Sequence, residues 1–491
     1  MSLSSSQVVQ KLWHYCNLLR DDGLSYPDYV EQLTFLIFLK MADELRASGK
    51  ETPDIPEKFA WPALLRRQGS DLHGHYGISL AALGRRSGMV GLIFKGAKNR
   101  IRDPDKLRRL VVELVDKEQW TSVDADVKGE AYEGLLEKTA KDTKSGAGQY
   151  FTPRPLIRAI VQVTEPGILE TICDPACGTC GFLLAAREFI TSTHLKPTKR
   201  EIVHQQLHAY HGFELVDSVA RLGAMNLVLH GIGPVGAEAP PPITIGDSLS
   251  IQTPKRFDLV LTNPPFGKKS SVKITHEIGA KPQALVANRS DFWATTANKQ
   301  LNFLQHIASI LSETGRAAVV LPDNTLFEGG AGEKVRRRLL KDFDVHTLLR
   351  LPSGIFYAQG VKANVLFFDR LTLKMRGRPR RLWVYDFRTN NHFTLKNKQL
   401  AQSDLDEFVR CYSADDRMAR RSTWLPHNPG GRWRSFTYEE LLERQHCSFD
   451  VCWLRNDQLI DRNTLPSPSQ LGKQIAVDLR NALRNIERAI R

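Results

Sequence analysis

The sequence contains few cysteines and no long apolar segment. Its seven cysteines, spread over 491 residues, are an odd number and do not form the disulfide framework of a small secreted domain. No apolar run is long enough to span a membrane, and the first six residues lack the charged-then-apolar pattern of a signal peptide. We therefore expect a cytoplasmic protein with reduced thiols.

Acidic residues are also in deficit. The chain has 68 lysines and arginines against 54 acidic residues, which gives a formal net charge of +14. Such a charge favours a polyanionic partner such as nucleic acid, but many basic proteins bind none, so charge alone leaves the question even. The chain is too long for one compact core, and two or three domains are expected.

The segment from Phe257 to Gly267 combines an apolar run with a proline pair. The apolar half, Phe257 to Leu261, predicts a buried strand. Pro264 and Pro265 end it, because proline has no N–H to donate to a neighbouring strand and its φ is fixed. Asn263 is therefore expected at the carboxyl end of a strand, where open α/β sheets bind their ligands.

Residues Asn263 to Phe266 suit a planar exocyclic amine such as N6 of adenine. The lone pair of that nitrogen is delocalised into the ring, so the nitrogen is a poor nucleophile. The Asn263 side-chain oxygen and the Pro264 carbonyl can each accept one N–H, which draws the nitrogen toward tetrahedral geometry. Pro265 would fix the turn, and Phe266 would stack on an extruded base. An isolated Asn-Pro-Pro is also a common strand end, so this interpretation depends on the motifs upstream.

A second motif runs from Thr171 to Leu183. A short strand enters a tight turn of small residues, and the apolar Phe182 and Leu183 open a helix. Small residues let the backbone approach a ligand closely, and a helix N-terminus favours a carboxylate. The predicted contacts in this turn are Asp174, Gly178, Thr179, Cys180 and Gly181.

Two acids follow the next two predicted strands. Glu214 can accept from both hydroxyls of a ribose, and Asp247 can accept from the amine of a cofactor's adenine. Neither acid alone is strong evidence for a cofactor site, because acids at strand ends and in turns are common. The order of cofactor turn, ribose acid, adenine acid and target amine is stronger, because each feature follows a strand, as a doubly wound sheet requires.

Upstream of the turn lies a helix start whose exposed amides suit a carboxylate. Its residues are Gln149, Tyr150, Phe151, Thr152, Pro153 and Arg154. As structure alone it is a helix start and nothing more. Its place just before the small-residue turn favours a role in binding the same ligand.

Taken together, these motifs resemble motifs X, I and IV of amino-methyltransferases that use S-adenosylmethionine. The wider chain resembles the modification (M) subunit of type I restriction-modification systems. The resemblance implies methyl transfer to N6 of a flipped adenine in double-stranded DNA, with Asn263, Pro264, Pro265 and Phe266 as catalytic residues. The helix start, the small-residue turn and the two acids Glu214 and Asp247 would bind S-adenosylmethionine. One position departs from motif I, since Cys180 stands where glycine or alanine is usual.

The fold implied is α/β, with a doubly wound, Rossmann-like, largely parallel sheet of seven strands. We expect a helical N-terminal domain over residues 1–140, the methyltransferase domain over 141–400, and a helical extension over 401–491 that ends in an amphipathic helix. Residues 316–321 and 365–368 are strand candidates. No separate target-recognition domain is evident, so the resemblance implies a specificity (S) subunit as partner, with a second copy of the chain and a restriction (R) subunit in the full complex.

Three alternatives stay open at this point. Cys173, Cys177 and Cys180 have the C-x3-C-x2-C spacing of radical enzymes that cleave S-adenosylmethionine at a [4Fe-4S] cluster, although the residues between them fit the methyltransferase turn. N5-glutamine methyltransferases use a similar Asn-Pro-Pro turn on a planar amide, but they are typically smaller. A catalytically silent binding subunit is the third. Apart from the cluster, we expect no metal site.

Overall fold

The computed structural model describes residues 26–49, 52–120, 152–234, 240–250, 253–266, 289–356, 362–373, 377, 379–394, 398–455, 476, 479 and 483. The predicted cofactor residues Gln149, Tyr150 and Phe151 lie outside these ranges, as does most of the predicted terminal helix. Within that helix, Leu479 and Leu483 are exposed. None of the helices in the described ranges has the length and apolarity needed to cross a membrane.

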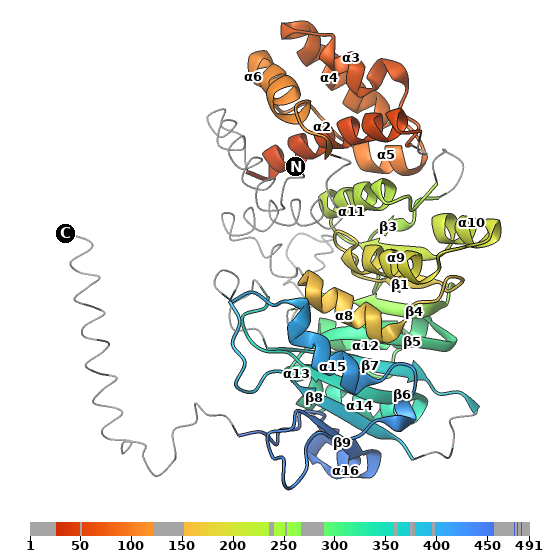
Figure 1. Ribbon diagram of the computed structural model, residues 1–491, viewed down its shortest axis with the longest axis vertical. Coiled ribbons are helices and arrows are strands. Elements are labelled where there is room, and N and C mark those ends of the chain that lie inside the picture. The colour runs from red at the N-terminus through yellow and green to blue at the C-terminus, as the bar shows by residue number, and fades with distance from the viewer. Residues whose placement is uncertain are drawn as a thin grey trace, which may run out of the picture.

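The described residues between 26 and 120 form helices and no strand, in agreement with the predicted helical region (Figure 1). The helices are α2 (Tyr26–Ala47), a 3-10 turn (Glu57–Phe59), α3 (Trp61–Leu65), α4 (Gly69–Leu83), α5 (Gly88–Phe94), α6 (Pro104–Arg109) and a π-helix (Leu110–Val115). The start of α6 shows how the sequence sets a boundary. The Asp103 side chain accepts from the backbone N–H of Asp105 and of Lys106, ahead of which Pro104 opens the helix.

The rest of the described chain is built on one mixed sheet, with strand order β3-β2-β1-β4-β5-β7-β6-β8-β9. The strands are β1 (Ile172–Asp174), β2 (Tyr210–Glu214), β3 (Ile243–Ile245), β4 (Phe257–Thr262), β5 (Leu311–Pro322), β6 (Phe343–Arg350), β7 (Ala363–Arg370), β8 (Arg381–Asp386) and β9 (Trp433–Thr437). The first five of these strands pair in parallel, β7 runs antiparallel between β5 and β6, and β9 runs antiparallel to β8.

The doubly wound α/β sheet and the strands over 316–321 and 365–368 are therefore confirmed, but the predicted count of seven strands is wrong. The described residues form nine. The last strand, β9, lies in the region expected to be helical and pairs with β8, where Trp433 stacks on Trp383 with ring centroids 5.3 Å apart. As an edge strand β9 is only partly buried, so it lacks the apolar run that predicts a buried strand.

Helices cover both faces of the sheet and give each face its own apolar cluster. One cluster includes residues of α8 (Arg154–Thr164), α9 (Gly181–Thr193), α11 (Asp217–Leu229) and α15 (Asp406–Tyr412), and is continuous with the N-terminal helices. The other includes residues of α12 (Lys299–Ile310), α14 (Ala331–Asp342) and α16 (Tyr438–Glu443). The remaining helices are α10 (Lys199–Leu207), α13 (Asn324–Phe327) and three short 3-10 helices (Gln402–Leu405, Arg417–Ala419 and Gln445–Cys447).

Residues along β1 and β4 alternate between these clusters, as the strand period of two requires. Ile172 and Leu259 lie in the cluster with α8 and α9, and Cys173 and Val260 lie in the cluster with α12. The chain leaves β1 toward β2 and β3 on one side and returns to β4 on the other. The carboxyl ends of β1 and β4 therefore form the switch point at which such sheets bind ligands.

Arg336 of α14 joins the C-terminal segment to the sheet domain. Its side chain is 1% exposed, and burial lowers its pKa to about 10, so it remains charged at neutral pH. The guanidinium donates to the carbonyls of Thr325 (2.8 Å), Glu328 (2.6 Å), His446 (2.7 Å) and Cys447 (3.0 Å). These bonds fix the segment that follows α16 against α13 and α14.

We expect Arg336→Met to lower the free energy of unfolding by about 2–4 kcal/mol, because methionine fills much of the volume but leaves buried carbonyls without donors. Urea unfolding followed by circular dichroism measures this. The matched control is Arg337→Met on the same helix, which removes an exposed ion pair with Glu333 and should cost about 0.5 kcal/mol or less. Equal effects of the two substitutions would contradict this role of Arg336.

Candidate active site

The described members of the predicted site gather at the carboxyl edge of the sheet. Asp174 is the last residue of β1, Glu214 the last of β2, and Asn263 directly follows β4. Asp247 lies two residues beyond β3. Because β3, β2, β1 and β4 are consecutive parallel strands, these four side chains lie along one edge, as the sequence order predicted.

The small-residue turn between β1 and α9 uses two left-handed residues. Gly178 has φ 54° and Cys180 has φ 68°. The Cys180 N–H donates to the carbonyl of Cys177 at 2.7 Å, which closes the turn. A non-glycine residue in this conformation costs about 1–2 kcal/mol, so the fold tolerates some strain at Cys180, where the family usually has glycine or alanine.

The thiol of Cys180 points toward α11. It is fully buried, and a Cβ placed on Gly223 of α11 would lie 2.9 Å from Cys180 Sγ and 2.8 Å from the carbonyl oxygen of Gly178. Glycine at position 223 therefore makes room both for the cysteine and for the turn itself.

Glu214 connects the end of β2 to the same turn. Its Oε2 accepts from the Gly178 N–H at 3.0 Å, and its Oε1 accepts from the Val216 N–H at 2.8 Å. Burial raises the pKa of this carboxyl, and the backbone donors act in the opposite direction. Each carboxylate oxygen keeps a second lone pair, so the backbone bonds are compatible with a ligand hydroxyl.

The carboxylate of Asp247 bonds within its own turn. Its Oδ1 accepts from the Leu249 N–H at 3.0 Å, and its Oδ2 accepts from the Ser250 hydroxyl at 3.3 Å. The side chain thus has a local structural role in addition to any contact with a ligand.

Asp174 links the turn to the strand that carries Asn263. Its Oδ1 accepts from the Thr262 hydroxyl at 2.6 Å and from the Ala176 N–H at 3.0 Å. The side chain is 2% exposed. Burial, with a smaller contribution from the charge of Glu214, raises the pKa of Asp174 to about 7. Asp174 therefore positions the backbone here, and its contact with the cofactor stays a prediction from the sequence.

The Asn263 amide is held from the side of α8. Its Nδ2 donates to the Thr152 hydroxyl at 2.9 Å, and the side chain is almost fully buried. The N-cap of α8 is Pro153, and that helix start has no side-chain cap. The Thr152 hydroxyl therefore contacts the predicted catalytic asparagine and does not cap the helix.

Two residues near the proline pair were not predicted. Gln300, in the first turn of α12, donates from Nε2 to the carbonyl of Pro265 at 3.2 Å. Phe356, buried in the segment after β6, packs edge-on against Phe266 with ring centroids 6.2 Å apart and planes at 73°. Neither residue belongs to a recognisable local pattern, because each reaches the site only through the fold.

The first turn of α8 places a cationic side chain beside the small-residue turn. A Cβ on Gly181 would lie 3.1 Å from Ile157 Cδ1 and 3.7 Å from Arg154 Nη1. The Arg154 side chain is 9% exposed. A buried guanidinium beside the N-terminus of α9 suits a ligand that carries a carboxylate.

The three cysteines of the radical-enzyme alternative do not share a site. Cys173 lies in the apolar cluster on the α12 face, whereas Cys177 and Cys180 lie in the cluster on the opposite face. All three are buried free thiols. Within the described ranges, no group of three or more histidine, cysteine or acidic side chains is arranged to hold a metal ion.

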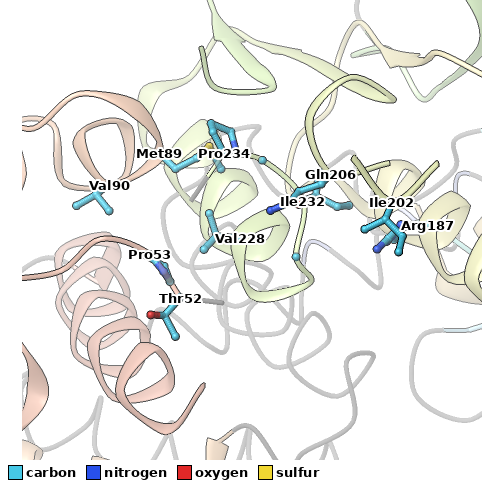
Figure 2. A pocket seen from close by; sticks show the side chains of 12 residues that line it. Thr52, Pro53, Met89, Val90, Arg187, Ile202, Gln206, Val228, Ile232 and Pro234 are labelled. Atoms are coloured by element: carbon cyan, nitrogen blue, oxygen red, sulfur yellow. The ribbon is translucent and has the colours of Figure 1, made fainter. Parts of the chain in front are cut away.

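A cavity of about 220 Å³ lies elsewhere, between the N-terminal helices and the region of α9 to α11 (Figure 2). Thr52, Pro53, Met89 and Val90 line one side. Residues of α9 to α11 and the segment 231–234 line the other. None of the predicted site residues lines it, so it is not the candidate active site.

Comparison with known proteins agrees with this geometry. Residues 123–426 match the family model for N-6 DNA methylases, and residues 8–114 match the HsdM N-terminal domain. The methylase subunit of the type I restriction enzyme StySJI from Salmonella typhimurium is 36% identical, over 100% of this chain and 96% of that protein.

Solved structures give the same result. The crystal structure of the M protein of the type I restriction enzyme EcoKI matches with a TM-score of 0.54 and 32% identity, covering 97% of this chain and 94% of that one. A chain of a solved type I restriction-modification system matches with a TM-score of 0.68 and 25% identity, covering 99% of this chain and 98% of that one. The protein is therefore a member of the N6-adenine DNA methyltransferase family and, within it, of the methylase subunits of type I restriction enzymes.

Proposed function

We propose that Asn263, Pro264, Pro265 and Phe266 receive an adenine extruded from duplex DNA, and that its N6 takes a methyl group from S-adenosylmethionine bound at the Gly178–Gly181 turn. The observation that carries this proposal is that two hydrogen bonds hold the Asn-Pro-Pro-Phe segment beside the residues proposed to bind the cofactor. Thr262, the residue before Asn263, bonds to Asp174, which ends the strand that leads into the turn. Asn263 itself bonds to Thr152, just before α8.

The residues around the turn fit S-adenosylmethionine, which supplies an electrophilic methyl group when bound. Glu214 would accept from the ribose hydroxyls, and Asp247 from the amine of the adenine ring. The Gly178–Gly181 backbone, with the Thr179 and Cys180 amides, would lie along the ligand. The buried Arg154 beside Gly181 fits its carboxylate. The sequence motif that precedes Arg154 (Gln149, Tyr150, Phe151, Thr152 and Pro153) would contact the same ligand.

For the target base, the chain supplies two acceptors and an aromatic surface. The Asn263 Oδ1 and the Pro264 carbonyl each accept one N–H of the amine, which localises its lone pair for attack on the methyl group. Gln300 fixes the Pro265 carbonyl and so limits rotation of the turn. Phe266 stacks on the base, and the edge-on contact with Phe356 holds the Phe266 ring in place. Each contact favours the transition state by positioning groups before reaction.

The partners follow from the type of subunit. The relatives are methylase subunits of type I restriction enzymes, and the net charge of +14 suits a DNA backbone. We infer a specificity subunit that selects the DNA sequence, with a second copy of this chain and a restriction subunit in the full complex. The family match favours DNA over a protein glutamine as the methyl acceptor.

Methyl transfer to DNA tests the proposal directly. With labelled S-adenosylmethionine and genomic DNA that lacks the modification, we expect label in N6-methyladenine when the chain is combined with its specificity subunit. Asn263→Ala should lower this rate by at least about 100-fold, because it removes one of two preorganised acceptors. Nucleoside analysis by mass spectrometry identifies the product, and sequencing of the modified DNA gives the target.

The control is cofactor binding by Asn263→Ala, measured by calorimetry, which should remain within about 3-fold of wild type, a change of under 1 kcal/mol. Label in protein and none in DNA would move the assignment to glutamine methylation. Unchanged DNA methylation by Asn263→Ala would exclude the proposed role of the amide.

Asp174 predicts a pH dependence of stability. Its folded pKa is raised from the ordinary value of 3.8 to about 7 by burial, so between these values the folded chain binds a proton that the unfolded chain does not. Its contribution therefore destabilises the folded state increasingly as pH rises from about 4 to 7. Asp174→Asn keeps the Oδ1 that accepts both hydrogen bonds and removes the charge.

We expect the Tm of Asp174→Asn to rise relative to wild type as pH increases across that range, and to change little relative to it below pH 4. Thermal unfolding at a series of pH values measures the difference. A constant difference between the two proteins from pH 4 to pH 8 would show that Asp174 does not titrate in this way.

Substitutions at Cys180 and Gly223 should differ in their effect on cofactor affinity. Cys180→Gly should keep the affinity for S-adenosylhomocysteine within about 2-fold of wild type, a change of under 1 kcal/mol, because the thiol points into α11. Gly223→Ala should weaken it by more than about 10-fold, since its Cβ would meet the Gly178 carbonyl and displace the turn. Calorimetry of both variants measures this. A large loss in Cys180→Gly would mean that the thiol contacts the ligand.

A further inference from the structure

The contact between Thr152 and Asn263 joins two predicted motifs that lie 111 residues apart. Thr152 was assigned to the cofactor by its sequence position, and Asn263 to the target base. In the structure the Asn263 Nδ2 donates to Thr152 Oγ1 at 2.9 Å. Within the described part of the chain, this is the one hydrogen bond that the hydroxyl makes.

A threonine hydroxyl alone does not select one orientation of an asparagine amide, because it can both donate and accept. It can accept from Nδ2, as observed, or donate to Oδ1 after the amide has rotated by half a turn. Only the first orientation presents Oδ1 to a target amine. The second would present Nδ2 to it, so that two donors would face each other.

The hydroxyl becomes selective when its own proton is donated elsewhere. It is then only an acceptor toward Asn263, and the amide must present Nδ2 to it. The segment that carries Thr152 also brings the buried Arg154 guanidinium to the cofactor turn, 3.7 Å from the position of a Cβ on Gly181. A ligand carboxylate attracted by this cation is the natural acceptor for the Thr152 proton.

We propose that Thr152 is a positioning residue that makes the orientation of the Asn263 amide depend on the carboxylate of the bound cofactor. This inference rests on the proposed function. When the Thr152 hydroxyl donates its hydrogen bond to the cofactor carboxylate, the Asn263 oxygen faces the target amine. The cofactor and the target base therefore bind cooperatively. By linkage, the target adenine strengthens binding of the carboxylate-bearing cofactor by the same factor.

The test compares two cofactor analogues on the full chain combined with its specificity subunit. S-adenosylhomocysteine carries the carboxylate, and 5′-deoxy-5′-methylthioadenosine lacks the whole amino-acid part. The DNA is an end-labelled duplex with the methylated sequence found above, bearing either adenine or purine at the target position. Purine has no N6 amine. Fluorescence anisotropy gives the duplex Kd with each analogue at its own saturating concentration.

For wild type, we expect the Kd for the adenine duplex to be about 10-fold lower with S-adenosylhomocysteine than with methylthioadenosine, a size typical of coupling between sites. The gain should fall to about 2-fold or less with the purine duplex, because purine has no amine that can donate to the Asn263 amide oxygen. Thr152→Val, which keeps the shape but not the hydroxyl, should lose the 10-fold gain with adenine, and Thr152→Ser should retain it.

Two results would overturn the inference while leaving the proposed function intact. One is a wild type that methylates DNA but binds the adenine duplex equally with both analogues. The other is a full gain in Thr152→Val at saturation, even if its affinity for S-adenosylhomocysteine falls, which would make Thr152 a cofactor contact only. A wild type that methylates no DNA would instead contradict the proposed function itself.

Discussion

The hydrogen bond from Thr262 to Asp174 is the contact on which the geometry of the site depends. These residues end the two parallel strands at the switch point of the sheet, and the bond of 2.6 Å holds the strand ends together in a buried environment. One strand leads into the turn proposed to hold the cofactor, and the other leads directly into Asn263. In the proposed reaction, the distance between methyl donor and acceptor would therefore be set by backbone and buried side chains.

Other contacts reinforce the same geometry from outside the sheet. The start of α8 contacts the turn through Arg154 and Ile157, and Thr152, just before α8, contacts Asn263 of the proposed catalytic segment. On the opposite side, Gln300 of α12 bonds to the Pro265 carbonyl. Helices from both faces of the sheet thus meet at its carboxyl edge. The proline pair adds rigidity, because it fixes φ at two consecutive residues.

Much of this site could be predicted from the sequence, because strand ends and turns leave local signals. Asp174, Glu214, Asp247 and Asn263 each end or follow a predicted strand, and a parallel sheet places such ends on one edge. Gln300 and Phe356 could not be found in this way, because they reach the site only by the packing of α12 and of the segment after β6. The contact between the Thr152 hydroxyl and Asn263 could not be predicted either, because a threonine before a helix usually indicates an N-cap.

The cysteines and the last strand show a second limit of the sequence. The C-x3-C-x2-C spacing indicated a shared ligand set, but Cys173 sits on a strand and faces away from the other two. The spacing of residues along the sequence does not show to which face of the sheet the side chain of a strand residue points. Strand β9 forms because it pairs with β8 at the edge of the sheet, and it has no apolar run from which it could be predicted. Cys180 is tolerated because Gly223, far away in sequence, leaves room for it.

The central claim concerns where the target amine lies. A structure of the full chain with its specificity subunit, S-adenosylhomocysteine and its target duplex would test it most directly. The account predicts an extruded adenine stacked on Phe266, with its N6 within hydrogen-bond distance of Asn263 Oδ1 and the Pro264 carbonyl and facing the sulfur of the ligand. An adenine held elsewhere, or a ligand bound away from the Gly178–Gly181 turn, would contradict it.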